Sequence, residues 1–157
     1  MRSDLPLTVY FDASCRLCHS EMRNIKGHDS AGYLLLVDCS AADFDDAPFS
    51  AFGITRAAMM GCLHVRDNQG AWIKGVPAFE LIYRTIGMSA LANFWGGYYT
   101  RPLMEKLYPW IARHRRVLSL TGLPLLFEAW GSYAARRAHK RSTQCSKGQC
   151  AIPPTMK

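Results

Sequence analysis

Residues 7–18 read LTVYFDASCRLC, and this stretch decides the fold. Its first five residues are apolar, β-branched or aromatic, which is typical of a buried strand. Cys15 and Cys18 follow shortly afterwards. If a helix begins at these cysteines, both thiols lie in its first turn, where the helix dipole favours a thiolate. The spacing therefore indicates a redox-active dithiol at a strand-to-helix junction.

Length and composition predict a single soluble domain. The chain has 157 residues, of which 49% are hydrophobic, and this is enough to bury an ordinary core. The N-terminus lacks the apolar region of a signal peptide, and we find no apolar stretch of about 18 residues. We therefore expect a cytoplasmic protein. Its six cysteines are then expected to be reduced or transiently oxidised, not to form a structural disulfide framework.

Positive charge is concentrated in the C-terminal third. Residues 1–100 contain 8 Lys or Arg and 10 Asp or Glu, whereas residues 101–157 contain 11 and 2. A solvated helix face explains this pattern, and a weak contact with an anionic membrane or an acidic partner stays open. We recognise no nucleic-acid-binding module, so no specific nucleic-acid partner is expected.

The first strand and the next elements predict a βαβ unit. Ser14 is a candidate N-cap for a helix that ends near Gly27. Residues 33–37 form a continuous apolar run, which predicts a central parallel strand buried on both faces. The helix between them has apolar residues at helical spacing, namely Cys18, Met22 and Ile25.

The middle of the chain completes an α/β core. Residues 38–58 predict one or two short helical turns. Residues 62–65 and 71–73 predict an antiparallel hairpin joined by the polar turn 67–70, and residues 78–86 predict a helix. The resulting order, β-α-β-(α)-β-β-α, is a thioredoxin-like arrangement with the CxxC at the first strand-helix junction.

A helical C-terminal extension is expected beyond this core. Apolar residues recur at helical spacing from Leu103 to Leu118, and residues 124–141 predict one more helix. Residues from 142 onward are small and polar, which is typical of a loose tail. We therefore divide the chain into a thioredoxin-like domain at 1–118, a basic helical extension at 119–141 and a flexible tail at 142–157.

Three segments resemble a known family. Residues 11–18, FDASCRLC, resemble the D-x-x-C-x-x-C signature of the DCC family of thiol-disulfide oxidoreductases. Residues 63–79 resemble its central hairpin and following helix, and Tyr108 to Arg115 or Arg116 resembles its late tyrosine-alanine-arginine stretch. The resemblance runs from about residue 7 to residue 118. It implies a thioredoxin-like fold and thiol-disulfide chemistry.

Three features differ from the pattern that this resemblance implies. Many family members have glycine after the aspartate and proline after the first cysteine, where this chain has Ala13 and Arg16. Both differences bear on loop shape and redox potential. The wider thioredoxin superfamily places a cis-proline before the third strand, but residues 58–61 contain no proline. We therefore expect a substrate groove unlike that of thioredoxin.

The two thiols have different expected roles. Cys15 is expected to be the exposed thiol and the nucleophile, because free backbone N–H groups and the helix dipole lower its pKa. Cys18, one turn further on, is the expected resolving thiol. Arg16 and His19 are candidate supporting residues, since a nearby positive charge favours a thiolate. The alternative for both is a solvated helix face.

Asp12 lies three residues before Cys15 and has two candidate roles. A partly buried carboxylate there could accept a proton from Cys18 during resolution. Alternatively, Asp12 is a turn or capping residue that accepts backbone hydrogen bonds. The two roles are compatible, so we count Asp12 with the catalytic candidates.

The other cysteines leave alternatives open. A zinc site would need a second pair of ligands beside the CxxC, for which Cys145 and Cys150 are the candidates, and inert thiols are a further alternative. We favour redox chemistry and expect no metal and no cofactor. Cys145 and Cys150 are also candidates for a secondary dithiol that exchanges electrons with the first. Cys39 and Cys62 are expected in the core.

The sequence therefore predicts a thiol-disulfide oxidoreductase that acts on a protein or small-molecule thiol or disulfide. The rival hypothesis is a non-catalytic thioredoxin-like interaction module or a membrane-surface module. Large apolar side chains in residues 123–133 precede a basic segment at 136–141, as in an interfacial helix. Packing of these side chains against the domain explains the same pattern.

Overall fold

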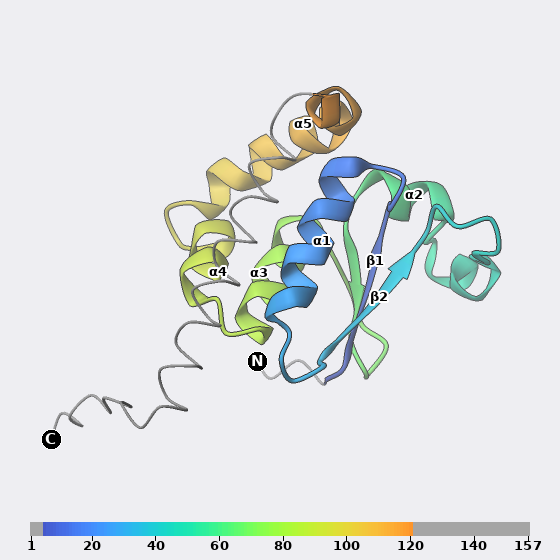
Figure 1. Ribbon diagram of the computed structural model, residues 1–157, viewed down its shortest axis with the longest axis horizontal. Coiled ribbons are helices and arrows are strands. Elements are labelled where there is room, and N and C mark those ends of the chain that lie inside the picture. Colours follow the sequence, from blue (N-terminus) through green and yellow to red (C-terminus); the bar gives the residue numbers. More distant parts are fainter. Residues whose placement is uncertain (1–4, 121–157) are drawn as a thin grey trace, which may run out of the picture.

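The computed structural model describes residues 5–120 and shows a mixed four-stranded sheet with helices packed on it (Figure 1). The sheet has the order β2-β1-β3-β4, in which β1 runs parallel to β2 and antiparallel to β3. β3 and β4 form an antiparallel hairpin. The strands are β1 (Leu7–Phe11), β2 (Leu34–Asp38), β3 (His64–Arg66) and β4 (Trp72–Lys74).

Helices connect and follow these strands. α1 (Arg16–His28) joins β1 to β2, so the CxxC lies where the central strand passes into the first helix. Before β3 come the 3-10 helix η1 (Ala47–Phe52) and α2 (Arg56–Gly61). After β4 come three helices, α3 (Val76–Thr85), α4 (Ser89–Gly96) and α5 (Arg101–Leu120).

Alternate residues of β1 belong to two hydrophobic clusters, because successive side chains of a strand point to opposite faces of the sheet. Leu7, Val9 and Phe11 pack with α1 and α3, whereas Tyr10 packs with the region of η1 and α2. Full burial of such a side chain contributes about 1.5–3 kcal/mol. The larger cluster also contains Met22, Ile25, Phe79 and Ile82.

α5 is attached to the core through Tyr108. The Tyr108 hydroxyl accepts a hydrogen bond from the backbone N–H of Leu63 at 2.9 Å. Its ring makes edge contacts with the rings of Phe79 and Trp95. From this attachment α5 continues towards the start of α1, where its last turn lies (Figure 1).

The predicted thioredoxin-like α/β fold is confirmed, and element boundaries shift by a few residues. The prediction that residues 33–37 form a central strand buried on both faces is wrong. β2 is an edge strand, with β1 as its neighbour in the sheet, and Leu35 is 51% exposed. Leu36 packs against the larger cluster and Val37 against the smaller one, so both faces of β2 are partly covered. Within the described part of the chain, the other edge of β2 has no neighbouring strand, and four of its five residues are not fully buried.

The domain boundaries stay predictions. Most of the expected extension and all of the expected tail, residues 121–157, lie outside the described residues. Among residues 5–120, no helix is long and apolar enough to span a bilayer.

Replacing Tyr108 by Phe removes the acceptor of the Leu63 N–H. Leu63 is buried, so its N–H would lose this partner without gaining water. We expect the free energy of unfolding, measured by urea denaturation, to fall by about 1–3 kcal/mol. Tyr99→Phe is the matched control, because Tyr99 is 89% exposed. Equal stabilities for the two variants would contradict this role of Tyr108.

Candidate active site

Cys15 is the N-cap of α1. Its backbone is extended, and its Sγ accepts a hydrogen bond from the backbone N–H of Cys18 at 3.3 Å. The sulfur thus takes the place that a hydroxyl or carboxylate oxygen has at most helix starts. The prediction of Ser14 as N-cap is wrong, because Ser14 instead donates both its N–H and its hydroxyl to Asp12.

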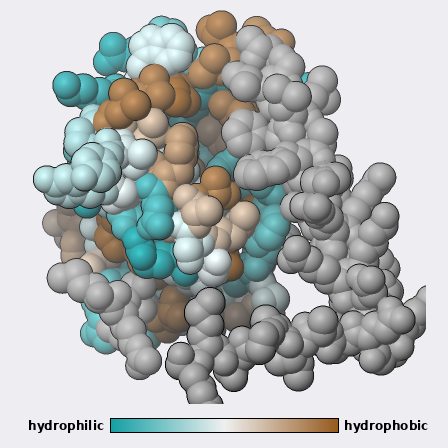
Figure 2. All heavy atoms as spheres, turned by 90° about the vertical axis from the view of Figure 1, so that its left-hand side faces the viewer, coloured by the Kyte–Doolittle hydropathy of each residue, from teal (hydrophilic) through white to brown (hydrophobic). Residues whose placement is uncertain are grey.

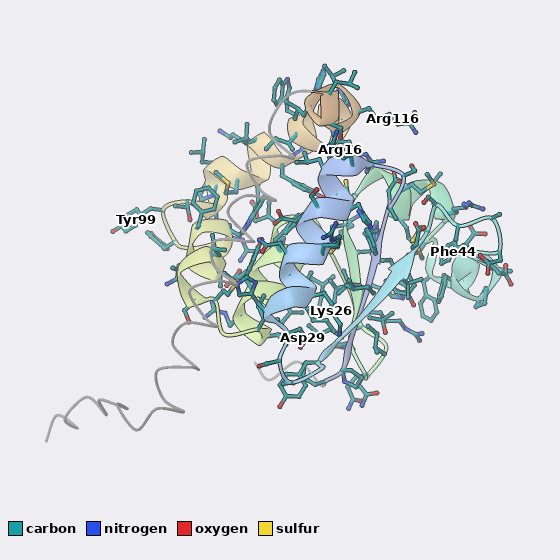
Figure 3. All side chains as sticks on the ribbon, in the orientation of Figure 1. Arg16, Lys26, Asp29, Phe44, Tyr99 and Arg116 are labelled. Carbon is teal, nitrogen blue, oxygen red and sulfur yellow. The ribbon has the colours of Figure 1, made fainter. Side chains whose placement is uncertain are left out.

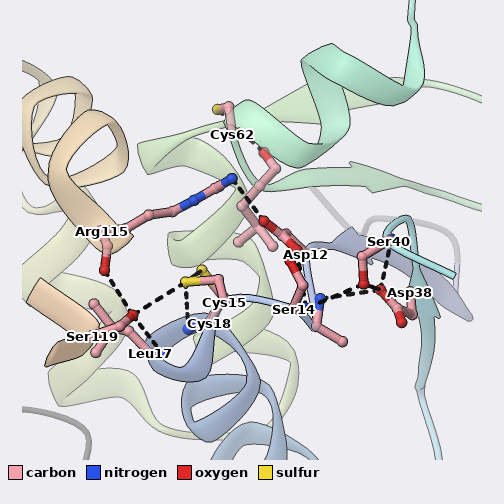
Figure 4. Close-up of polar contacts among 12 residues, drawn as sticks. Asp12, Ser14, Cys15, Leu17, Cys18, Asp38, Ser40, Cys62, Arg115 and Ser119 are labelled. Atoms are coloured by element: carbon pink, nitrogen blue, oxygen red, sulfur yellow. Dashed lines mark hydrogen bonds and ion pairs between the residues drawn. The ribbon is translucent and has the colours of Figure 1, made fainter. Parts of the chain in front are cut away.

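The two thiols of the CxxC are in direct contact (Figure 4). The Sγ of Cys18 donates to the Sγ of Cys15 at 2.7 Å. This hydrogen bond lowers the pKa of Cys15 to about 6, against the effect of burial, and the Cys18 N–H, Ser119 and Arg115 contribute in the same direction. The same contact and burial raise the pKa of Cys18. At neutral pH the pair therefore favours a thiolate on Cys15 and a proton on Cys18.

Cys15 is covered by the last turn of α5, and its exposed fraction is 3%. Ser119 Oγ lies 3.7 Å from Cys15 Sγ, accepts the N–H of Leu17 at 3.2 Å and donates to the carbonyl of Arg115 at 2.7 Å. The expectation that Cys15 is the exposed thiol is therefore wrong. The cover comes from a segment about 100 residues further along the chain, which the local CxxC pattern does not reveal.

Asp12 is buried and both of its carboxylate oxygens have partners. Oδ1 accepts the N–H of Ser14 at 3.0 Å and its hydroxyl at 2.5 Å. Oδ2 accepts Nη2 of Arg115 at 2.8 Å. The turn-residue role considered for Asp12 is thus present, and its role as a proton acceptor stays a prediction.

The loop between β1 and α1 is also held by the end of β2. Asp38 Oδ1 accepts the N–H of Ala13 at 3.1 Å, and Ser40 Oγ accepts the N–H of Ser14 at 3.2 Å. Among residues 5–120 no residue other than glycine has a positive φ, so Ala13 fits this loop without backbone strain. Arg16 is the first residue of α1, a position where the helix needs no backbone N–H, so that proline is favoured there but other residues are tolerated.

Arg115 joins the site from α5. The family resemblance pointed to Arg115 or Arg116, and only the former meets Asp12; Arg116 is exposed near the same end of the molecule (Figure 3). Tyr108 and Arg115 are seven residues apart, about two helical turns, and therefore share one face of α5. This spacing is the sequence signal that distinguishes Arg115 from its neighbour.

Arg16 and His19 are both exposed, on the first turn of α1. Within residues 5–120 neither side chain has a hydrogen bond or ion pair to the Cys15 thiol, and the positive charge that lowers the pKa of Cys15 is that of Arg115. Their supporting role stays a prediction. From the sequence, only cations close to Cys15 along the chain could be proposed. The cation that influences Cys15 in the structure is Arg115, which α5 brings from a distant segment.

The remaining cysteines have different surroundings. Cys39 is fully buried in the smaller core cluster, as predicted, and burial raises its pKa to about 12. Cys62 is half-buried and lines a cavity, so its placement in the core is wrong. Cys145 and Cys150 lie outside the described residues. Residues 5–120 contain no cluster of three or more His, Cys, Asp or Glu suited to a metal ion.

The cavity has a volume of about 620 Å³ and lies between α1, α3, α4 and α5. Its walls are mainly apolar, and Figure 2 shows apolar side chains gathered on the side of the molecule where α4 and α5 lie. Cys18 lines this cavity but Cys15 does not. The two thiols therefore face different surroundings, the end of α5 for Cys15 and the cavity for Cys18.

Comparisons with known proteins place the chain in a family. An Arabidopsis thaliana protein described as uncharacterized and chloroplastic is 26% identical over 147 residues, which are 93% of this chain and 65% of that relative. The chain thus spans less than two thirds of its length. No solved structure matches the sequence. The family model of the DCC1-like thiol-disulfide oxidoreductases matches residues 9–121, a range that contains the CxxC, Asp12, Arg115 and Ser119. The chain belongs to the DCC1-like thiol-disulfide oxidoreductase family.

Proposed function

We propose that this protein exchanges electrons with thiols and disulfides through Cys15 as the nucleophile and Cys18 as the resolving thiol. The observation that carries this proposal is the 2.7 Å contact between the two sulfurs, with the pKa of Cys15 lowered and that of Cys18 raised. A thiolate is the nucleophile in disulfide exchange, and a protonated neighbour keeps the charge on a single sulfur. A protein or small-molecule thiol or disulfide is the proposed substrate.

The first step joins Cys15 to the substrate. The Cys15 thiolate attacks one sulfur of a substrate disulfide, the substrate S–S bond breaks, and the other substrate sulfur leaves as a thiolate that takes a proton from solvent. Because Ser119 lies against Cys15, this step requires the last turn of α5 to move aside. Three contacts hold that turn on this side, Ser119 with Cys15, Ser119 with Leu17 and Arg115 with Asp12.

The second step releases the product. Cys18 loses its proton and attacks Cys15, so that the internal disulfide forms and the second substrate sulfur leaves as a thiolate. Asp12 lines the same cavity as Cys18, and its charge opposes the ionisation of that thiol. We assign Asp12 as the group towards which the Cys18 proton moves, in keeping with general-base catalysis.

Contact with a membrane surface is a second candidate function. Tyr98, Tyr99, Leu103, Val117 and Leu120 are each more than half exposed on or beside α5. The same helix carries exposed basic residues that have no ion-pair partner among the described residues, namely Lys106, Arg113 and Arg116. Exposed apolar and aromatic side chains next to positive charge are typical of a surface that binds anionic lipid.

Cysteine variants test the dithiol. With a small soluble disulfide at pH 7, Cys15→Ser is expected to lower the reduction rate at least about 30-fold. This factor is the thiolate fraction of a thiol with a pKa of about 6, divided by the thiolate fraction of a thiol with an ordinary pKa. Cys18→Ser is expected to accumulate a mixed disulfide on Cys15, identified by mass spectrometry. Cys39→Ala is the control and is expected to react like the wild type. A mixed disulfide found only on Cys145 or Cys150 would contradict the assignment.

The pH dependence of Cys15 alkylation tests the thiolate. Because the thiolate is the reactive form, the rate is expected to rise with pH through about 6 and then to level off. Arg115→Gln and Ser119→Ala each remove a group that lowers the pKa of Cys15, so the midpoint should move to higher pH. Arg116→Gln is the matched control for the charge. A midpoint near 8.5 in the wild type, as for a free thiol, would refute the proposed thiolate.

Co-sedimentation with anionic vesicles tests the membrane surface. At low salt the protein is expected to bind, and Val117→Asp is expected to weaken binding because it places a negative charge on the apolar face of α5. Leu35→Asp is the matched control, since Leu35 is also about half exposed but lies on β2. No binding at low salt, or equal loss in both variants, would remove this candidate.

A further inference from the structure

The cavity beside Cys18 has flat aromatic walls. Phe79 and Trp95 stack with a centroid distance of 4.3 Å, and Tyr108 meets both rings edge-on. A volume of about 620 Å³ lies within the usual range for small-molecule sites, about 300–1,000 Å³. The shape and lining therefore suit an apolar molecule with a planar ring.

The charges on the described walls are accounted for within the protein. Asp12 and Arg115 pair with each other at 2.8 Å. Glu21, one turn after Cys18 on α1, accepts a hydrogen bond from the hydroxyl of Tyr83, and burial raises its pKa, which favours a protonated carboxyl. No described cation on these walls is free to bind an anionic ligand, so a charged disulfide such as that of glutathione is a poor fit.

The rim of the cavity is apolar as well. Phe94, Leu107 and Trp110 line the cavity and are 50%, 39% and 53% exposed. A ligand therefore crosses an apolar rim before it meets the thiols that line the cavity, Cys18 and Cys62. Of these two, Cys18 is the one in contact with the Cys15 sulfur. Figure 2 shows apolar side chains interspersed with polar ones on this side of the molecule.

We propose that the cavity binds an apolar quinone, which accepts two electrons from the Cys15–Cys18 dithiol. This inference rests on the proposed function and adds to it the electron acceptor and the direction of the reaction. A quinone meets three conditions at once, since it is planar, uncharged and reduced by two electrons and two protons. An apolar aliphatic disulfide is also uncharged and is also reduced by two electrons and two protons, but it lacks the planar ring that the aromatic walls suit.

The reaction balances with the groups present. The Cys18 sulfur adds to a ring carbon of the quinone, a C–S bond forms, and the Cys18 proton passes to one quinone oxygen. The Cys15 thiolate then attacks the Cys18 sulfur, so that the S–S bond forms and the C–S bond breaks. The ring keeps the electron pair, and Glu21 gives its proton to the second oxygen. The products are the protein disulfide, a hydroquinone and the Glu21 carboxylate, so the dithiol is oxidised by two electrons and the quinone is reduced by two.

The test uses the full chain, fully reduced and free of oxygen, with a water-soluble short-chain benzoquinone. The wild type is expected to form one hydroquinone per protein and to lose the thiols of Cys15 and Cys18, as measured by mass spectrometry. Leu107→Glu places a charge on the rim and is expected to slow this reaction about tenfold or more. Leu103→Glu is the matched control, because Leu103 lies one turn earlier on α5, is exposed and does not line the cavity.

Two further measurements separate the quinone proposal from the proposed function. Reduction of a small polar disulfide is expected to be unchanged in Leu103→Glu. A wild type that does not reduce this disulfide would show that the dithiol assignment is wrong. Quinone binding is measured separately by quenching of tryptophan fluorescence in a variant with both Cys15→Ser and Cys18→Ser. Saturable quenching that Leu107→Glu abolishes supports the cavity. Equal rates of quinone reduction and equal quenching in the two Leu variants would overturn the proposal. Saturable binding of an aromatic disulfide, without saturable binding of the quinone, would overturn it as well.

Discussion

The buried ion pair between Asp12 and Arg115 is the interaction on which the site depends. Their oxygen and nitrogen lie 2.8 Å apart, and the side chains are 0% and 14% exposed. The pair joins the end of β1 to the last turns of α5 across 103 residues of sequence. Removing one partner of such a pair typically costs about 3–5 kcal/mol, because the other charge stays buried without compensation. This contact, together with the attachment through Tyr108, therefore sets the position of the helix that covers Cys15.

The same arginine links architecture to reactivity. Its charge favours the Cys15 thiolate, and its helix also supplies Ser119, which holds the N–H of Leu17 at the start of α1. The largest contribution to the low pKa of Cys15 is nevertheless the hydrogen bond from Cys18. The buried Cys15 thiolate is thus stabilised mainly by a hydrogen bond from the neutral Cys18 thiol. The cation completes this arrangement from a distant part of the chain.

Local pattern was sufficient for the elements around the dithiol. The apolar, β-branched and aromatic run at Leu7–Phe11, the helical spacing after Cys15 and the polar turn before β4 each predicted the element found. Local pattern did not predict the features that depend on contacts between segments far apart in the sequence. The edge position of β2 depends on how the strands pair, and the cover over Cys15 depends on how α5 packs against α1. The N-cap was missed for a chemical reason, since a thiol is a rare cap and Ser14 was the conventional candidate.

The cover over Cys15 also bears on chemical damage. A thiolate that is both of low pKa and open to solvent is the type that peroxides oxidise to sulfenic acid and then irreversibly to sulfinic acid. Cys15 meets the first condition but not the second, with 3% of its surface exposed. Should a sulfenic acid form, the Cys18 sulfur is close enough to condense with it into a disulfide, which reductants reverse. The last turn of α5 thus limits the access of peroxides to the Cys15 sulfur.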